Sequence, residues 1–199
     1  VSFIFLRNLN INYAKNENLK LDAGELFKGK LLLKNIKNIS SSDVIFLSVI
    51  GLSVFWGVSQ GLMAVFPSFA KEYLGVTDVF VINAVIGASG IGIAIGSLIY
   101  SKISKHYIEI GTIPFSALGM ALMIYVSTIV QTPFLLGMSF LVFGIFGGLF
   151  VVPLNALIQF NAKKKVLGTI LAGNNWFHSL AMFLMLALTT TVSFYDLDP

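Results

Sequence analysis

The sequence predicts an all-α membrane protein with five transmembrane helices, and three observations support this fold class. The 199 residues are 56% apolar and only 11% charged, with a mean hydropathy of +0.87, whereas soluble domains carry about 25% charged residues. Long stretches of the chain contain no charge, and the basic residues gather between them. A core of this size cannot hide so much apolar surface from water, so lipid is the implied solvent.

The helices follow from the lengths of the uncharged stretches, which are Val44–Ala70, Val79–Ser101, Ile110–Ala162 and Val166–Tyr195. About 20 apolar residues cross a bilayer, so the first, second and fourth stretches each fit one helix. The third stretch is too long for one helix, and Pro133 divides it because proline starts or ends helices. We therefore expect helices at about 44–70, 78–100, 108–130, 133–159 and 167–194.

The first 42 residues differ in kind from the rest. Residues 7–42 are rich in Asn and Lys and predict a polar connection with a short amphipathic helix near Glu25–Ile36. The apolar residues 1–6 are expected to end an earlier span, so that the chain is a piece of a longer protein. We accordingly divide it into residues 1–42, the end of a preceding helix plus a basic loop, and residues 43–199, a transmembrane region.

The basic residues predict the orientation of the helices in the membrane. Twelve of the 13 lie in three segments that alternate crossings place on one side, namely residues 7–42, 102–106 and 161–165, and only Lys71 lies on the other side. Loops rich in Lys and Arg face the cytoplasm. We therefore expect these three segments to be cytoplasmic.

Several functional classes are not expected. The net charge of +4 lies between apolar runs rather than on one face, which argues against nucleic-acid binding. The chain contains no G-x-S-x-G or phosphate-binding glycine motif, and neither His106 nor His178 is followed five residues later by aspartate. Two histidines without a carboxylate pair, in a chain without cysteine, make a metal site unexpected. We expect no enzymatic activity and no cofactor.

Small residues recur every four positions in two of the predicted helices: Ala88, Gly92 and Gly96 in one, and Gly144 and Gly148 in the other. This spacing lets helix backbones approach closely in lipid. One interpretation is static packing. The other is a sliding contact between helices that rock during transport.

Polar side chains at membrane depth are the candidates for substrate binding, because such groups normally face a bundle interior or a cavity. The candidates are Gln60, Asn155, Gln159, Asn174, Asn175 and His178, with Ser59 beside the first of them. They could instead form hydrogen bonds between helices. If the fourth and fifth helices are antiparallel neighbours, their polar groups converge from two walls.

Three further residues are candidates for packing or gating, namely Lys102, Glu109 and Pro153. Glu109 is expected just inside the third helix, in an ion pair with Lys102, Lys105 or His106. Pro153 falls within the fourth helix, where proline can kink a helix and free backbone groups.

Several motifs resemble those of one transporter family. Gly147-Gly148-Leu149-Phe150-Val151-Val152-Pro153-Leu154-Asn155-Ala156-Leu157-Ile158-Gln159 closely resembles the matching helix of bacterial lysophospholipid transporters of the major facilitator superfamily, including forms fused to an acyltransferase and an acyl-carrier-protein ligase. Phe55-Trp56-Gly57 and Gly173-Asn174-Asn175 add to this match. The turn Gly96–Lys105 resembles a degenerate form of the superfamily's turn signature.

The resemblance implies a twelve-helix transporter of two halves, in which this chain would hold the central loop and about helices 7–11. It implies movement of lysophospholipids, chiefly lysophosphatidylethanolamine, across the bacterial inner membrane, in contact with membrane lipid, a missing N-terminal half and a fused or separate acyltransferase. Two alternatives stay open. The protein could be a general major facilitator for a small solute or drug, or a membrane anchor for a fused acyltransferase.

Overall fold

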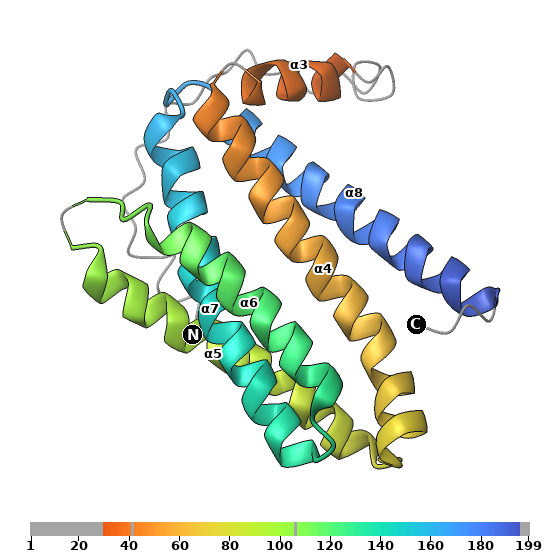
Figure 1. Cartoon of the computed structure of the whole chain (residues 1–199). Helices are drawn as coiled ribbons and strands as arrows, with labels where there is room; N and C mark the ends of the chain where they lie inside the picture. The colour runs from red at the N-terminus through yellow and green to blue at the C-terminus, as the bar shows by residue number, and fades with distance from the viewer. Residues whose placement is uncertain (1–29, 41, 106, 196–199) are drawn as a thin grey trace, which may run out of the picture. The chain divides into compact units, whose positions relative to one another are not determined.

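The computed structural model describes residues 30–40, 42–105 and 107–195. The expected end of an earlier span at residues 1–6, most of the basic segment and His106 lie outside the described residues. The chain divides into two compact units, Val1–Leu33 and Lys34–Pro199. All five long helices belong to the second unit (Figure 1).

The described residues form helices and contain no strand. The helices are α3 Lys30–Ile39, α4 Asp43–Leu74, α5 Val79–Ile103, α6 Thr112–Ile129, α7 Pro133–Asn161 and α8 Leu167–Phe194. The last five are each long and apolar enough to cross a membrane. The predicted fold class and number of spans are therefore confirmed. The short helix expected near Glu25–Ile36 corresponds in its described part to α3.

Local chemistry explains where the helices begin and end. α4 continues past the expected residue 70 to Leu74 and ends at Gly75, whose φ of 64° is left-handed and whose N–H bonds to the Ala70 carbonyl. This is a common glycine stop, because glycine adopts that conformation without steric cost. α5 begins where the Asp78 carboxylate accepts from the Phe80 N–H at 2.8 Å. α7 begins at Pro133, whose missing N–H costs nothing in a first turn.

The third span starts later than expected, at Thr112 rather than near residue 108. The buried Tyr100 hydroxyl accepts a hydrogen bond from the Glu109 N–H at 3.1 Å, and the Glu109 carboxylate accepts from the Gly111 N–H at 3.3 Å. These bonds hold Glu109 in the loop before α6. The expectation that it lies inside the helix is therefore wrong. Among the described residues it makes no ion pair with Lys102 or Lys105, and Lys102 is exposed.

Contacts link four of the spanning helices in the order α5, α7, α4, α8, and α6 packs on α7. The α5–α7 contact is the most extensive, followed by α4–α8 and α6–α7. One cavity lies between α4, α5 and α7, and another lies between α4, α6 and α7.

Glycines bring α5 and α7 into backbone contact. A Cβ on Gly92 would overlap the Leu141 carbonyl oxygen and lie 2.9 Å from the Gly144 Cα, and one on Gly96 would overlap the Ile145 carbonyl oxygen. Gly148 meets the backbone of α5 in the same way. The small-residue stripe is therefore a close helix–helix contact. Its use as a sliding surface stays a prediction.

Helix α4 is joined to its other neighbours by side-chain packing. A buried cluster gathers residues of α3, α4, α7 and α8, namely Ile39, Ile45, Val49, Leu52, Leu154, Ile158 and Ile170. Pro153 is fully buried within α7 next to this cluster's Leu154. Further along, Gly57 and Gly61 of α4 face Ala181 and Met185 of α8. The two helices thus run in the same direction.

Candidate functional site

The polar residues of α7 and α8 do not converge as expected. That expectation required the two helices to be antiparallel neighbours, but α8 packs along α4, and its backbone approaches that of α7 at very few points. Helix α4 separates them because Gly57 and Gly61 allow α8 to approach it closely. The expectation that α7 and α8 pack side by side is therefore wrong, and the binding role of their polar residues stays a prediction.

On α7, one of the two predicted residues is half-buried and the other is exposed. Asn155 is half-buried, and its Nδ2 donates to the Val151 carbonyl of its own helix at 2.9 Å. Its side-chain oxygen is left to accept from an ammonium or a hydroxyl. Gln159 is exposed one turn later. Among the described residues, neither side-chain amide forms a hydrogen bond to another helix.

On α8, burial separates two neighbouring amides. Asn174 is 3% exposed and its Oδ1 has no hydrogen-bond partner among the described residues, whereas Asn175 is exposed. His178 is half-buried, and its Nε2 also lacks a partner in the described part of the chain. Unpaired buried polar atoms cost free energy. Two of the predicted residues therefore carry polar atoms that the described protein leaves unsatisfied.

His178 faces α4 through an aromatic contact. Its ring centroid lies 6.4 Å from that of Trp56, and Trp56 in turn packs edge-on against Phe55 at 5.3 Å. Gln60, the predicted residue on α4, is half-buried one turn after Trp56. The α4–α8 contact, rather than an α7–α8 contact, therefore brings predicted polar residues near one another.

A small cavity of about 40 Å³ lies next to Trp56, which lines it, between α4, α5 and α7. Ser59 lines it, and the Ser59 Oγ is buried without a partner among the described residues. The rest of the wall is apolar and includes Leu62, Met63, Ile93 and Phe143. Ser59 is not among the residues that the sequence predicts for the site. The sequence feature that could have identified it is a hydroxyl next to Gln60 in an otherwise apolar helix.

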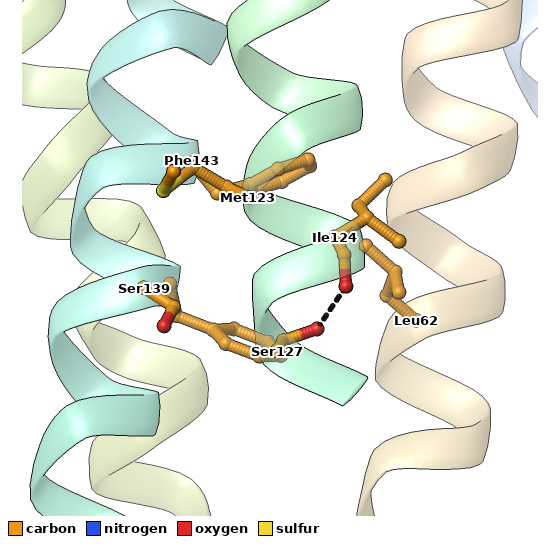
Figure 2. A pocket seen from close by; sticks show the side chains of 7 residues that line it. Leu62, Met123, Ile124, Ser127, Ser139 and Phe143 are labelled. Carbon is orange, nitrogen blue, oxygen red and sulfur yellow. Dashed lines mark hydrogen bonds between the residues drawn. The ribbon is translucent and has the colours of Figure 1, made fainter. Parts of the chain in front are cut away.

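A wider cavity of about 410 Å³ lies on the α6 side, between α4, α6 and α7. A narrow recess next to it, shown in Figure 2, shares Leu62, Ile124, Ser127 and Phe140 with this cavity. The Ser127 hydroxyl donates to the Ile124 carbonyl at 2.6 Å, as the dashed line in Figure 2 marks. Thr128 likewise bonds within its own helix. The hydroxyls of α6 at this cavity are therefore already satisfied, and no residue predicted for the site lines it.

Two of the cavities in the described part of the chain thus differ in their chemistry. The α6-side cavity is large and apolar, with Glu72 at its wall. The α5-side cavity is small but carries an unpaired hydroxyl and adjoins the Trp56–His178 contact. No group of three His, Asp or Glu side chains suited to a metal ion occurs in the described ranges. Uncharged hydrogen bonding in apolar surroundings is the chemistry available here.

Comparisons with known proteins agree with this architecture. The sequence profile of the Major Facilitator Superfamily matches residues 2–186. A protein named lysophospholipid transporter LplT from Photorhabdus laumondii is 28% identical over 185 residues, which cover 87% of this chain and 45% of the relative. Proteins of the same name from Serratia proteamaculans and Escherichia coli O157:H7 are 33% and 32% identical, each over 71% of this chain.

The chain spans less than half the length of these curated relatives, namely 45%, 35% and 36%. No solved structure matches the chain. The five apolar helices and the similarity to transporters identify a multi-pass membrane protein. Because the superfamily profile covers nearly the whole sequence, the chain belongs to the Major Facilitator Superfamily.

Proposed function

We propose that the full-length protein moves lysophospholipids, chiefly lysophosphatidylethanolamine, across the bacterial inner membrane. The similarity to proteins named lysophospholipid transporters, over 87% of the chain in one case, carries this proposal. We further propose that the chain supplies about helices 7–11 of a twelve-helix transporter, with an N-terminal half elsewhere in the protein. The relatives' greater length supports this assignment.

The distribution of polar groups suits an amphiphilic substrate. The polar candidates within the described spans are neutral at depth, and large apolar side chains surround them. Binding sites for such ligands are mostly apolar with a few polar groups that fix orientation. We propose that Gln60, Asn155, Gln159, Asn174, Asn175 and His178 contact the substrate at different stages of its passage. A small polar solute would be poorly matched by such surroundings.

Uptake into proteoliposomes tests this function. The full-length protein should accumulate radiolabelled lysophosphatidylethanolamine above protein-free liposomes. Asn175→Ala should lower uptake at least about tenfold, because a hydrogen bond to a charged group contributes about 1.5–3 kcal/mol. Asn83→Ala, which removes an exposed amide from α5, should transport normally. Uptake of a small solute or drug, with no uptake of the lipid, would contradict the proposal.

The orientation is a second part of the proposal. The segments 7–42, 102–106 and 161–165 hold 12 of the 13 basic residues, and we propose that all three face the cytoplasm. In a cysteine-free background, Lys164→Cys should resist an impermeant thiol reagent in intact cells, whereas Thr77→Cys should react. Opening the cells should expose Lys164→Cys to the reagent. Labelling of Lys164→Cys in intact cells would reverse the assigned orientation.

A further inference from the structure

We propose that Ser59 and His178, which both lie close to Trp56, bind the phosphate of the lysophospholipid, so that its head-group site is centred on α4. This inference rests on the proposed function and deepens it. It differs from the sequence prediction in its location, because the α4–α8 contact and the α5-side cavity replace the expected α7–α8 pair.

The first support is the presence of unpaired polar atoms. The Ser59 Oγ and the His178 Nε2 are both buried with no hydrogen-bond partner among the described residues. Most serines of the described spans behave differently. Ser53 and Ser97, for example, donate to carbonyls of their own helices at 2.7 Å. Since burying an unpaired polar group is costly, a ligand that pairs with these atoms recovers that cost on binding.

The second support is the geometry around Trp56. Trp56 lines the cavity together with Ser59, and its ring lies 6.4 Å from that of His178 on α8. The indole N–H is a donor only, the serine hydroxyl can donate, and neutral histidine donates when Nε2 carries the proton. Trp56 is 36% exposed, so its edge is accessible. Two of these donors, on Trp56 and Ser59, therefore belong to residues that line the cavity, and the third belongs to a ring packed next to Trp56.

The third support is the charge of the surroundings. No lysine or arginine occurs in α4 before Lys71, and none occurs in α8. A phosphodiester at this depth must therefore be held by neutral donors of this chain. Hydrogen bonds to an ionised acceptor are stronger than neutral ones, especially where water is excluded. Such a site can hold a phosphate without the strong attraction of an ion pair.

The fourth support is the apolar wall of the cavity. Leu62, Met63, Ile93 and Phe143 surround Ser59 on the α4, α5 and α7 sides. The volume of about 40 Å³ accommodates a small polar group rather than a whole lipid. The acyl chain would therefore leave the cavity across the exposed edges of Trp56 and Met63, which are 36% and 45% exposed. In the wider α6-side cavity, the hydroxyls of Ser127 and Thr128 are already bonded within α6.

A matched pair of serines on one helix tests the assignment. Ser59 lines the α5-side cavity and Ser68 lines the α6-side cavity. In the full-length protein, Ser59→Ala and His178→Phe should each raise the apparent Kd for lysophosphatidylethanolamine at least about tenfold, as expected for a lost hydrogen bond to a charged group. Ser68→Ala should leave it unchanged. Ser59→Thr keeps the hydroxyl and should bind nearly as well as wild type.

Two further ligands identify the phosphate as the recognised group. Monoacylglycerol with the same acyl chain lacks phosphate, so its competition for the site should be the same in wild type and Ser59→Ala. Inorganic phosphate alone should not displace the lipid. If Ser59→Ala weakened the binding of both lipids equally, phosphate recognition would be overturned. Displacement of the lipid by inorganic phosphate would instead assign the site to a soluble anion.

Thermal unfolding separates binding from structure. Since the Ser59 hydroxyl has no partner, Ser59→Ala should be at least as stable as wild type without lipid. A marked loss of stability would show a structural role, and His178→Phe then supplies the independent binding test. Normal lipid binding by both variants would overturn this inference alone. Failure of the wild-type protein to bind or transport lysophosphatidylethanolamine would overturn the proposed function as well.

Discussion

Gly92→Ala is expected to destabilise the folded protein by about 1–3 kcal/mol, or more if the backbones cannot separate. The added methyl group would overlap the Leu141 carbonyl oxygen and lie 2.9 Å from both the Gly144 Cα and the Ile145 nitrogen. All of these are backbone atoms of α7, so no side-chain rotation relieves the overlap. The two helices must move apart along the most extensive contact in the bundle. Thermal unfolding in detergent measures the effect.

Gly90→Ala provides the matched control, because Gly90 lies on the same helix and its Cβ would meet nothing within 4 Å. Alanine stabilises a helix relative to glycine by about 0.5–1 kcal/mol. Gly90→Ala should therefore be neutral or slightly stabilising. If both substitutions lowered stability equally, general helix perturbation rather than the α5–α7 contact would explain the loss.

Leu52→Ala is expected to cost about 2–5 kcal/mol. Leu52 is 0% exposed in the cluster that joins α3, α4, α7 and α8. In lipid, apolar burial gives little driving force between helices, so the lost contribution is the van der Waals contact of a close-packed side chain. Truncation leaves a void that the surrounding backbones cannot easily fill. Reduced folded yield and a lower unfolding temperature should both follow.

Leu47→Ala is the corresponding control on the same helix, because Leu47 is 65% exposed. It removes the same atoms from a position with few protein contacts in the described bundle. We expect little change in stability. A large loss at Leu47 would mean that a part of the protein outside the described residues packs there, and comparable losses at both positions would contradict the assignment of Leu52 as a core residue.

Local features of the sequence predicted most of the secondary structure. Pro133 marked the start of α7, and the uncharged run from Val166 onward predicted α8 at its observed bounds. The third helix was predicted to begin too early, because the loop residues around Ile110 are as apolar as the residues of the helix itself. The bond between the Tyr100 hydroxyl and the Glu109 N–H, which fixes that loop, joins residues nine apart. Hydropathy carries no information about such a bond.

The candidate site was harder to predict than the spans. The sequence singled out Asn174 and His178 because polar groups stand out within apolar helices, and their buried, unpaired atoms agree with that signal. It could not say which helix faces them. The prediction treats neighbours along the chain as neighbours in space, but α4 lies between α7 and α8.

The sequence by itself determined the membrane environment, the five spans and the segregation of basic residues, because each depends on the local length, polarity and charge of the chain. The tertiary structure alone decided the order of the helices, the pairing of Gly92 with Leu141 and the position of Ser59 beside the Trp56–His178 contact. These depend on the rotation of each helix about its axis. With mainly apolar residues on every side, the helices carry no strong polar face, so only close packing between small residues and their partners sets that rotation.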